Sequence, residues 1–241
     1  KDIDSIKFAK NSEVQIIDNF AFFIFGLDAD NKKLTIPSSV KEIKEKWCEN
    51  IDRLKKIKIA PNNQYYKSYE NKYILGKSSP TDENFDVLVS SARKNKTVII
   101  PNFIKAIRSY AFYNRYYLHH VIISPNSNLQ IIEKYAFASS KIEYISIPAC
   151  LTHISECAFY SCENLREVNI PLNSKLQTIG NRAFYFSKIR KFSIPPSLKK
   201  ICESAFYNCQ NLCQIDIPTN SELQIIEKDA FAYSSIKSLF I

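Results

Sequence analysis

Glycine is scarce in this chain of 241 residues, which holds only Gly26, Gly76 and Gly180, each isolated in the sequence. Phosphate-cradling loops, dinucleotide-binding turns and nucleophile elbows need clustered glycines, so none of these sites can be built here. Long apolar runs are missing as well. The longest, which contains residues 21–25, is far shorter than the roughly 20 residues that cross a bilayer. The sequence therefore predicts no nucleotide-binding enzyme and no transmembrane segment.

Histidine is almost as rare, with only His119, His120 and His153. His119 and His120 are neighbours at the start of an expected strand, where adjacent side chains point to opposite faces, so they do not easily chelate one metal ion. The seven cysteines are an odd number and have no Cys-x-x-Cys spacing. We therefore expect no metal, no cofactor, no catalytic residue and no enzymatic activity.

Charge is present in excess but not in clusters. The chain carries 33 basic and 24 acidic residues, a formal net charge of +9. This excess predicts a weak general attraction to polyanions such as glycosaminoglycans. Proteins that read nucleic-acid sequences usually gather Arg and aromatic residues on one element. That pattern is missing, so we expect no specific nucleic-acid partner.

What the sequence does contain is an internal repeat. Seven phenylalanines directly follow an alanine, and the last six are spaced by 25, 22, 25, 22 and 25 residues. The repeating unit is therefore a 47-residue pair of two related halves. One half is found at residues 147–165 and 194–212, and the other at 126–142, 173–189 and 220–236. The seven aromatic residues are Phe22, Phe112, Phe137, Phe159, Phe184, Phe206 and Phe231.

Each repeat carries a segment typical of a half-buried strand, because apolar and polar residues alternate until a proline ends it. These segments are residues 118–125, 142–148, 165–171, 189–195 and 212–218. A second apolar set, such as Leu176, Ile179, Ala183 and Phe184, has the spacing of one tight helical turn. A single repeat is too short for its own core, so we predict a solenoid whose coils stack along one continuous hydrophobic spine.

The first 61 residues are a divergent version of the same repeat. Residues 11–17 match the start of one half, and Trp47 stands near the place of a repeat phenylalanine. Residues 62–97 interrupt the pattern: 73–75 and 85–89 are strand-like and flank a polar turn, which predicts an inserted β-hairpin. Residues 98–241 are regular. We expect one domain, cut from a longer chain, with uncapped ends that could mediate self-association.

The repeat signature, Ile-Pro-x-x-Leu-x-x-Ile-x-x-x-Ala-Phe-x-x-Cys-x-x-Leu-x-x-Ile-x-Ile-Pro, resembles the BspA-type, or Treponema pallidum-type, leucine-rich repeat. The likeness runs from residue 3 to residue 241, with 62–97 irregular, and the family's usual Ile-Gly survives only at Ile179-Gly180. It implies a right-handed leucine-rich-repeat superhelix with one parallel β-sheet on one face and short helical turns or irregular segments on the other. It also implies a cell-surface or secreted protein that adheres to host cells or matrix proteins. The family brings no catalytic residues.

The outward positions of the predicted strands are the candidate binding surface. If Val168 and Ile170 point inward, Glu167 and Asn169 face the open side of the sheet, and the other repeats follow. Such a surface suits host or matrix proteins and, as a further option, glycans. The candidate residues are His120, Ile122, Tyr144, Ser146, Glu167, Asn169, Lys191, Ser193, Gln214 and Asp216.

Cys162 and Cys209 lie 47 residues apart at the same repeat position, which favours buried free thiols. A disulfide between adjacent coils remains an alternative for Cys157, Cys162, Cys202, Cys209 and Cys213.

Three functions stay open on this basis. The first is a surface module that binds protein partners. The second is a structural spacer or self-association array without a specific ligand, and the third is a weak binder of polyanions such as glycosaminoglycans.

Overall fold

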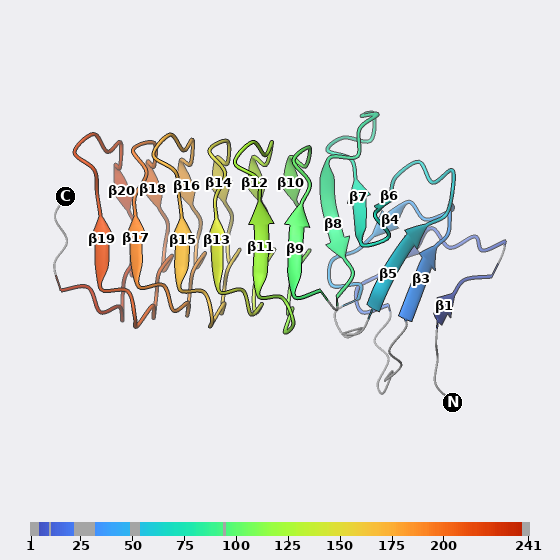
Figure 1. Ribbon diagram of the computed structural model, residues 1–241, viewed down its shortest axis with the longest axis horizontal. Coiled ribbons are helices and arrows are strands. Elements are labelled where there is room, and N and C mark those ends of the chain that lie inside the picture. The colour runs from blue at the N-terminus through green and yellow to red at the C-terminus, as the bar shows by residue number, and fades with distance from the viewer. Residues whose placement is uncertain (1–4, 10, 22–31, 49–53, 94, 238–241) are drawn as a thin grey trace.

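The computed structural model describes residues 5–9, 11–21, 32–48, 54–93 and 95–237. In these ranges it has twenty short β-strands and no helix. From β9 onward the chain coils regularly, and each coil adds one strand to a row on either side of the molecule (Figure 1). This arrangement confirms the predicted repeat solenoid.

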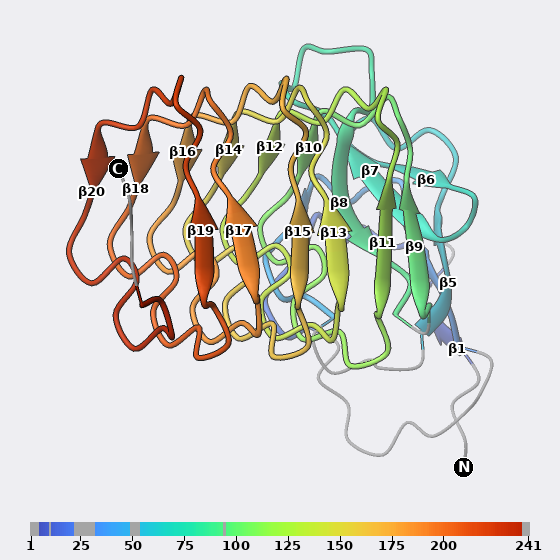
Figure 2. The same cartoon turned by 60° about the vertical axis from the view of Figure 1, so that its left-hand side comes forward.

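The first row, here called the front sheet, is parallel and carries the longer strands. Its first four strands are hydrogen-bonded in the order β15-β13-β11-β9, and β17 pairs with β19 to continue the row (Figures 1 and 2). The front-sheet strands are β9 (Thr97–Ile100), β11 (His120–Ile123), β13 (Tyr144–Ser146), β15 (Glu167–Asn169), β17 (Lys191–Ser193) and β19 (Gln214–Asp216).

The second row, the rear sheet, consists of two-residue parallel strands that continue into a three-stranded antiparallel segment. The parallel strands are β10 (Ala106–Ile107), β12 (Ile131–Ile132), β14 (His153–Ile154), β16 (Thr178–Ile179), β18 (Lys200–Ile201) and β20 (Ile225–Ile226). The antiparallel strands are β6 (Lys67–Tyr69), β7 (Tyr73–Gly76) and β8 (Val87–Ser91).

The prediction of helical turns opposite the front sheet is wrong in detail. The segment from Leu176 to Phe184 contains β16 and a turn instead of a helical turn. The reason is that backbone N–H groups in these segments donate to the next coil. Phe159 N donates to Ala183 O at 2.8 Å, and Phe184 N donates to Ala205 O at 2.8 Å. A helix would need those donors within its own segment.

The repeat phenylalanines form one continuous stack inside the coils. Phe112, Phe137, Phe159, Phe184 and Phe206 are fully buried. Centroids of successive rings, from Phe112 through to Phe231, lie 4.9, 5.3, 5.2, 5.1 and 5.4 Å apart, with interplanar angles of 17° or less. The predicted alignment of the aromatic positions is thus confirmed from Phe112 to Phe231, whereas Phe22 lies outside the described residues.

The N-terminal part forms a separate block with its own two parallel sheets. Trp47 is buried there, as its repeat position predicted, but it packs in a different hydrophobic cluster from the phenylalanine stack. One sheet consists of β1 (Ser5–Lys7), β3 (Lys32–Ile36) and β5 (Leu54–Ile59), and the other of β2 (Ile16–Ile17) and β4 (Glu42–Ile43).

The inserted hairpin separates the two clusters. Strands β7 and β8 pair antiparallel, as predicted for residues 62–97, and β6 adds a strand that the sequence did not indicate. Every residue of β7 and β8 is buried, because Leu75 and Leu88 pack into the cluster of the regular coils while Ile74 and Val89 pack into that of the N-terminal block. The expected single spine is therefore two cores with the hairpin as their shared wall. The predicted bounds of the divergent (1–61), inserted (62–97) and regular (98–241) segments of one domain remain a prediction.

Candidate functional site: the front face and the junction

All ten predicted binding residues lie on the outer side of the front sheet. They are the first and third residues of β11, β13, β15, β17 and β19, whose middle residues point inward. Strand pairing places His120 beside Tyr144, Tyr144 beside Glu167, and Lys191 beside Gln214. The structure thus brings the predicted residues together on one surface, here called the front face. That this face binds a ligand remains a prediction.

The front face has an apolar end that the sequence only partly indicated. Ile99 is 60% exposed, Ile122 is 44% exposed and Tyr144 is 43% exposed. Ile99 in β9 pairs with Ile122 in β11, and the ring of His120 lies 5.5 Å from that of Tyr144. The prediction missed Ile99 because β9 begins at the end of the irregular segment, although its alternation is the same as in later repeats.

The other end of the front face is polar and internally bonded. Lys191 Nζ lies 2.7 Å from Asp216 Oδ2, and Gln214 Nε2 donates to Asp216 Oδ1 at 2.7 Å. The hydrogen bond from Lys191 outweighs the effect of burial and holds the pKa of Asp216 below its usual value. Because these side chains already satisfy one another, a ligand gains less from contacting them than from covering the apolar end.

A row of tyrosines along the coils was not predicted. The residue after several repeat phenylalanines is tyrosine, and ring centroids of Tyr160 and Tyr185 lie 5.0 Å apart, those of Tyr185 and Tyr207 4.9 Å, and those of Tyr207 and Tyr233 5.0 Å. The first two pairs are stacked within 7° of parallel. The signal was the recurring Ala-Phe-Tyr triplet. Since stacked rings cover one another's faces, this row stabilises the array.

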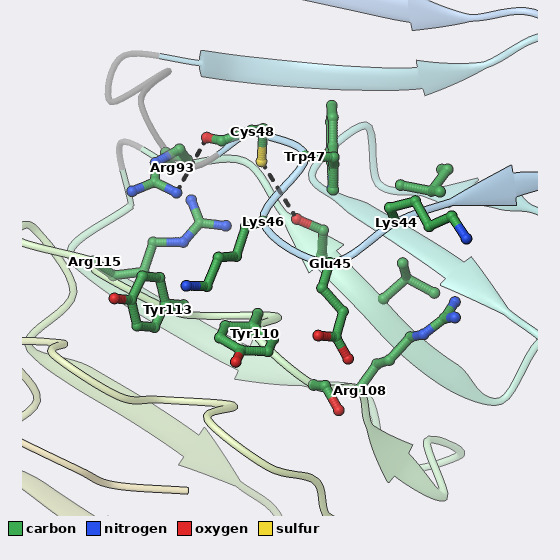
Figure 3. A pocket seen from close by; sticks show the side chains of 14 residues that line it. Lys44, Glu45, Lys46, Trp47, Cys48, Arg93, Arg108, Tyr110, Tyr113 and Arg115 are labelled. Carbon is green, nitrogen blue, oxygen red and sulfur yellow. Dashed lines mark hydrogen bonds between the residues drawn. The ribbon is translucent and has the colours of Figure 1, made fainter. Parts of the chain in front are cut away.

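A small enclosed pocket lies where the N-terminal block meets the regular coils (Figure 3). Its volume is about 20 Å³, room for one water molecule. Arg93 Nη1 donates to Cys48 O at 3.3 Å and its Nη2 donates to Asn114 O at 2.8 Å. Lys46 Nζ lies 4.9 Å from the ring centroid of Tyr110, a cation–π contact. These contacts hold the two blocks together, and the pocket is too small for a ligand.

Two larger grooves flank the hairpin. One, of about 550 Å³, lies at the junction and contains four cationic side chains and one carboxylate. The other, of about 510 Å³, contains the aromatic side chains of Tyr69, Phe85 and Phe103 with mixed charges. Tyr69 and Phe103 make an edge-to-face contact at 5.4 Å. Neither groove was predicted, because its walls come from segments far apart in the sequence.

All seven cysteines are free thiols. The alternative of a disulfide between adjacent coils is therefore wrong. Cys162 and Cys209 are fully buried, and burial raises the pKa of Cys162 to about 12 and that of Cys209 to about 11. Each donates to a phenylalanine carbonyl of the preceding coil at 3.1 Å.

Other titratable groups form local pairs. His119 Nδ1 lies 2.9 Å from Glu143 Oε1, and this hydrogen bond lowers the pKa of Glu143 despite some burial. In the described ranges, no three His, Cys, Asp or Glu side chains are grouped as a metal site. No helix in the same ranges could span a membrane.

A family model of the BspA-type leucine-rich repeat region matches in six copies, over residues 1–74, 89–212 and 130–241. The match covers most of the chain and leaves out the tip of the hairpin. This chain therefore belongs to the BspA-type leucine-rich repeat family. None of the curated proteins matches it.

Three solved bacterial structures share the fold. A leucine-rich cell surface protein from Faecalibacterium prausnitzii has 24% identity and a TM-score of 0.68, over 94% of this chain and 55% of that one. A leucine-rich repeat protein from Eubacterium ventriosum has 22% identity and a TM-score of 0.63, over 99% and 66%. One from Bacteroides ovatus has 20% identity and a TM-score of 0.58, over 100% and 54%. The chain thus spans about half to two thirds of their length.

Proposed function

We propose that this chain is a non-enzymatic interaction module of a cell-surface or secreted protein, and that it binds protein partners on host cells or in the extracellular matrix. The observation that carries this proposal is the adjacent exposure of Ile99, Ile122 and Tyr144 on an otherwise polar sheet. Exposed apolar groups rimmed by polar ones are typical of protein-binding sites, and tyrosine is a frequent anchor. Family membership and a cell-surface relative with the same fold support the localisation.

The test compares two triple variants of the whole chain. In the front variant, Ile99→Ser, Ile122→Ser and Tyr144→Ser remove the apolar end of the front face. In the control variant, Leu172→Ser, Ile225→Ser and Tyr233→Ser remove three apolar side chains elsewhere that are at least as exposed. Binding to epithelial cells and to immobilised matrix proteins is measured for both, with thermal unfolding as the check of folding.

We expect the front variant to bind its partner about tenfold or more weakly, the loss typical of removing an anchor cluster. The control variant should bind like the unmodified chain. Ile225 and Tyr233 lie in the last described coil. If the control variant loses binding and the front variant keeps it, contacts between coils of different molecules dominate, and the structural spacer is the better description.

A further inference from the structure

We propose that the 550 Å³ groove at the junction, here called the junction groove, is a binding site for an anionic saccharide. This site is separate from the front face and does not depend on the function proposed for it. The groove lies between the N-terminal block, the turn after β7 and the outer side of the rear sheet. Its volume falls within the roughly 300 to 1,000 Å³ of small-ligand sites.

The charge of the junction groove is strongly positive. Lys41, Lys77, Lys105 and Arg108 line it, against a single carboxylate, Glu133. Glu133 Oε2 already accepts hydrogen bonds from Ser109 N at 2.9 Å and Ser109 Oγ at 3.0 Å. The Glu133 carboxylate is therefore already hydrogen-bonded within the protein. The four cationic side chains outnumber it, so the groove carries a net positive charge.

Three of the four cations are available to a ligand. Lys105 is paired with Asp86 at 2.8 Å. In the part of the chain that the structure describes, Lys41, Lys77 and Arg108 have no such carboxylate partner, and Lys77 rests over the ring of Phe85 at 5.1 Å. Arg108 offers the planar donor geometry that suits sulfate and carboxylate groups.

Two adjacent tyrosines also line the junction groove. Tyr65 is exposed, while Tyr66 is buried and its hydroxyl accepts a hydrogen bond from Ile43 N at 3.0 Å. Asn63 Oδ1 accepts from the backbone N–H groups of both tyrosines, at 2.9 and 2.7 Å, and Asn63 Nδ2 donates to Val40 O at 2.8 Å. The backbone of both tyrosines and the ring of Tyr66 are therefore ordered before a ligand binds, which lowers the entropy lost on binding.

These features favour a saccharide over an acidic peptide. An extended peptide gains most of its affinity from an unpaired strand edge. The groove is lined by side chains and by the paired strands β8, β10 and β12, and no residue of the edge strand β6 lines it. A compact sugar instead needs an apolar face for its ring, which Tyr65 supplies, and cations for its sulfate or carboxylate groups.

The test measures binding of a sulfated heparin tetrasaccharide and of sialyllactose to the whole chain by calorimetry in about 0.15 M salt, where long-range attraction is largely screened. Binding of the first points to a glycosaminoglycan as the source, and binding of the second to a terminal acidic glycan; either supports the proposal. A neutral tetrasaccharide of similar size, maltotetraose, carries neither sulfate nor carboxylate and should not bind. If neither anionic sugar binds, the proposal is overturned.

Two variants locate the site. Lys77→Ser with Arg108→Ser should weaken binding about tenfold or more. Lys175→Ser with Lys228→Ser removes the same charge from exposed positions outside the groove and should change affinity by less than about twofold. If both double variants lose the same affinity for the sugar, the net charge of the chain and not the groove is responsible for binding, and the proposal is overturned.

Tyr65→Ala keeps all charges and the backbone bond to Asn63, and should weaken sugar binding several-fold without changing its salt dependence. An acidic peptide, oligo-glutamate, serves as the competing ligand. If it binds as tightly as the sugars and is equally sensitive to Tyr65→Ala, the groove is a peptide site and the saccharide proposal is wrong.

Discussion

Single residues in unusual backbone conformations make the tight turns of this solenoid. In each regular coil two residues, placed two before and two after the repeat phenylalanine, have positive φ between 52° and 60°. None of them is glycine. They are Tyr110, Asn114, Tyr135, Ser139, Cys157, Ser161, Arg182, Phe186, Ser204, Asn208, Asp229 and Tyr233. Glycine adopts this conformation more readily than other residues, so the chain keeps its turns at a cost in stability.

Ser161→Gly should therefore stabilise the chain. Its φ is 52°, and the left-handed conformation costs roughly 1–2 kcal/mol in a residue with a Cβ. The greater conformational freedom of glycine in the unfolded chain offsets part of that gain. The free energy of unfolding should therefore rise by about 0.5 kcal/mol or more. Urea unfolding is the measurement. Ser146→Gly in β13, an extended position, should destabilise the chain instead; stabilisation by both variants would contradict the argument.

The one glycine that the family pattern retains has a different role. Gly180 is not among the positive-φ positions, but a Cβ at this residue would lie 2.7 Å from Glu156 N and 2.7 Å from Ser155 C in the preceding coil. Backbone atoms of two coils approach each other there. The glycine thus permits close contact and not a special turn.

The buried and exposed cysteines should differ in their reactivity toward alkylating reagents. Thiolate is the reacting form, and the raised pKa values of Cys162 and Cys209 leave almost none of it at about pH 8. Cys213 is exposed. In the folded chain we expect iodoacetamide to modify Cys213 first and to leave Cys162 and Cys209 unmodified until the chain unfolds, as read by peptide mass spectrometry. Early modification of Cys162 would contradict its burial.

At the scale of the element, the coil is the unit of stability. Each coil contacts its neighbours through a phenylalanine ring, two strands and backbone bonds such as Phe159 N to Ala183 O. Among the described strands from β9 to β20, each strand is hydrogen-bonded only to strands of the adjacent coils or, at β10, to the hairpin. Damage to one coil should therefore be felt mainly by the adjacent ones.

Phe159→Ala should reduce the free energy of unfolding by about 3–5 kcal/mol, because it leaves a cavity in the middle of the ring stack. Hydrogen exchange should accelerate most in the coils of β11 to β16, which contain Phe137, Phe159 and Phe184. Phe159→Leu, which keeps more of the volume, is the matched variant and should cost less. Uniform acceleration over the whole chain would argue against stacking of semi-independent coils.

At the scale of the whole molecule, two cores share the hairpin as a wall. Asp86, which directly precedes β8, ties the hairpin to the first regular coils: Lys105 lies 2.8 Å from one carboxylate oxygen and Ser78 Oγ donates to the other at 2.7 Å. Burial acts to raise the pKa of Asp86, but the hydrogen bonds from Lys105 and Ser78 outweigh it and the pKa is lowered.

A lowered carboxyl pKa stabilises the fold above the ordinary value of about 4 and loses that effect as the pH falls through the lower, folded-state pKa. Asp86→Asn should therefore be less stable than the unmodified chain at neutral pH, and the difference should shrink in acid. Urea unfolding at a series of pH values measures it. Glu163→Gln, which removes an exposed partner of Lys141, should show almost no difference at any pH.

The repeat spacing was enough to predict the stacked coils, the aligned phenylalanines, the buried Cys162 and the outward face that includes Tyr144. These follow from local periodicity, since a side chain's place in a coil fixes whether it points inward or outward. The second strand of each coil was mistaken for a helical turn. Its two residues, such as Thr178 and Ile179, are too few to show a period of their own.

The sequence by itself determined that this protein is a solenoid of the BspA type, because every regular coil repeats the same pattern of buried and exposed positions. Only the tertiary structure decided that the spine is divided at the hairpin, that Ile99 joins the front face, and that Arg108 shares a groove with Lys41 and Lys77. The physical reason is distance along the chain: these contacts involve the divergent and inserted segments, and the regular spacing that fixes the position of one coil on the next is interrupted there.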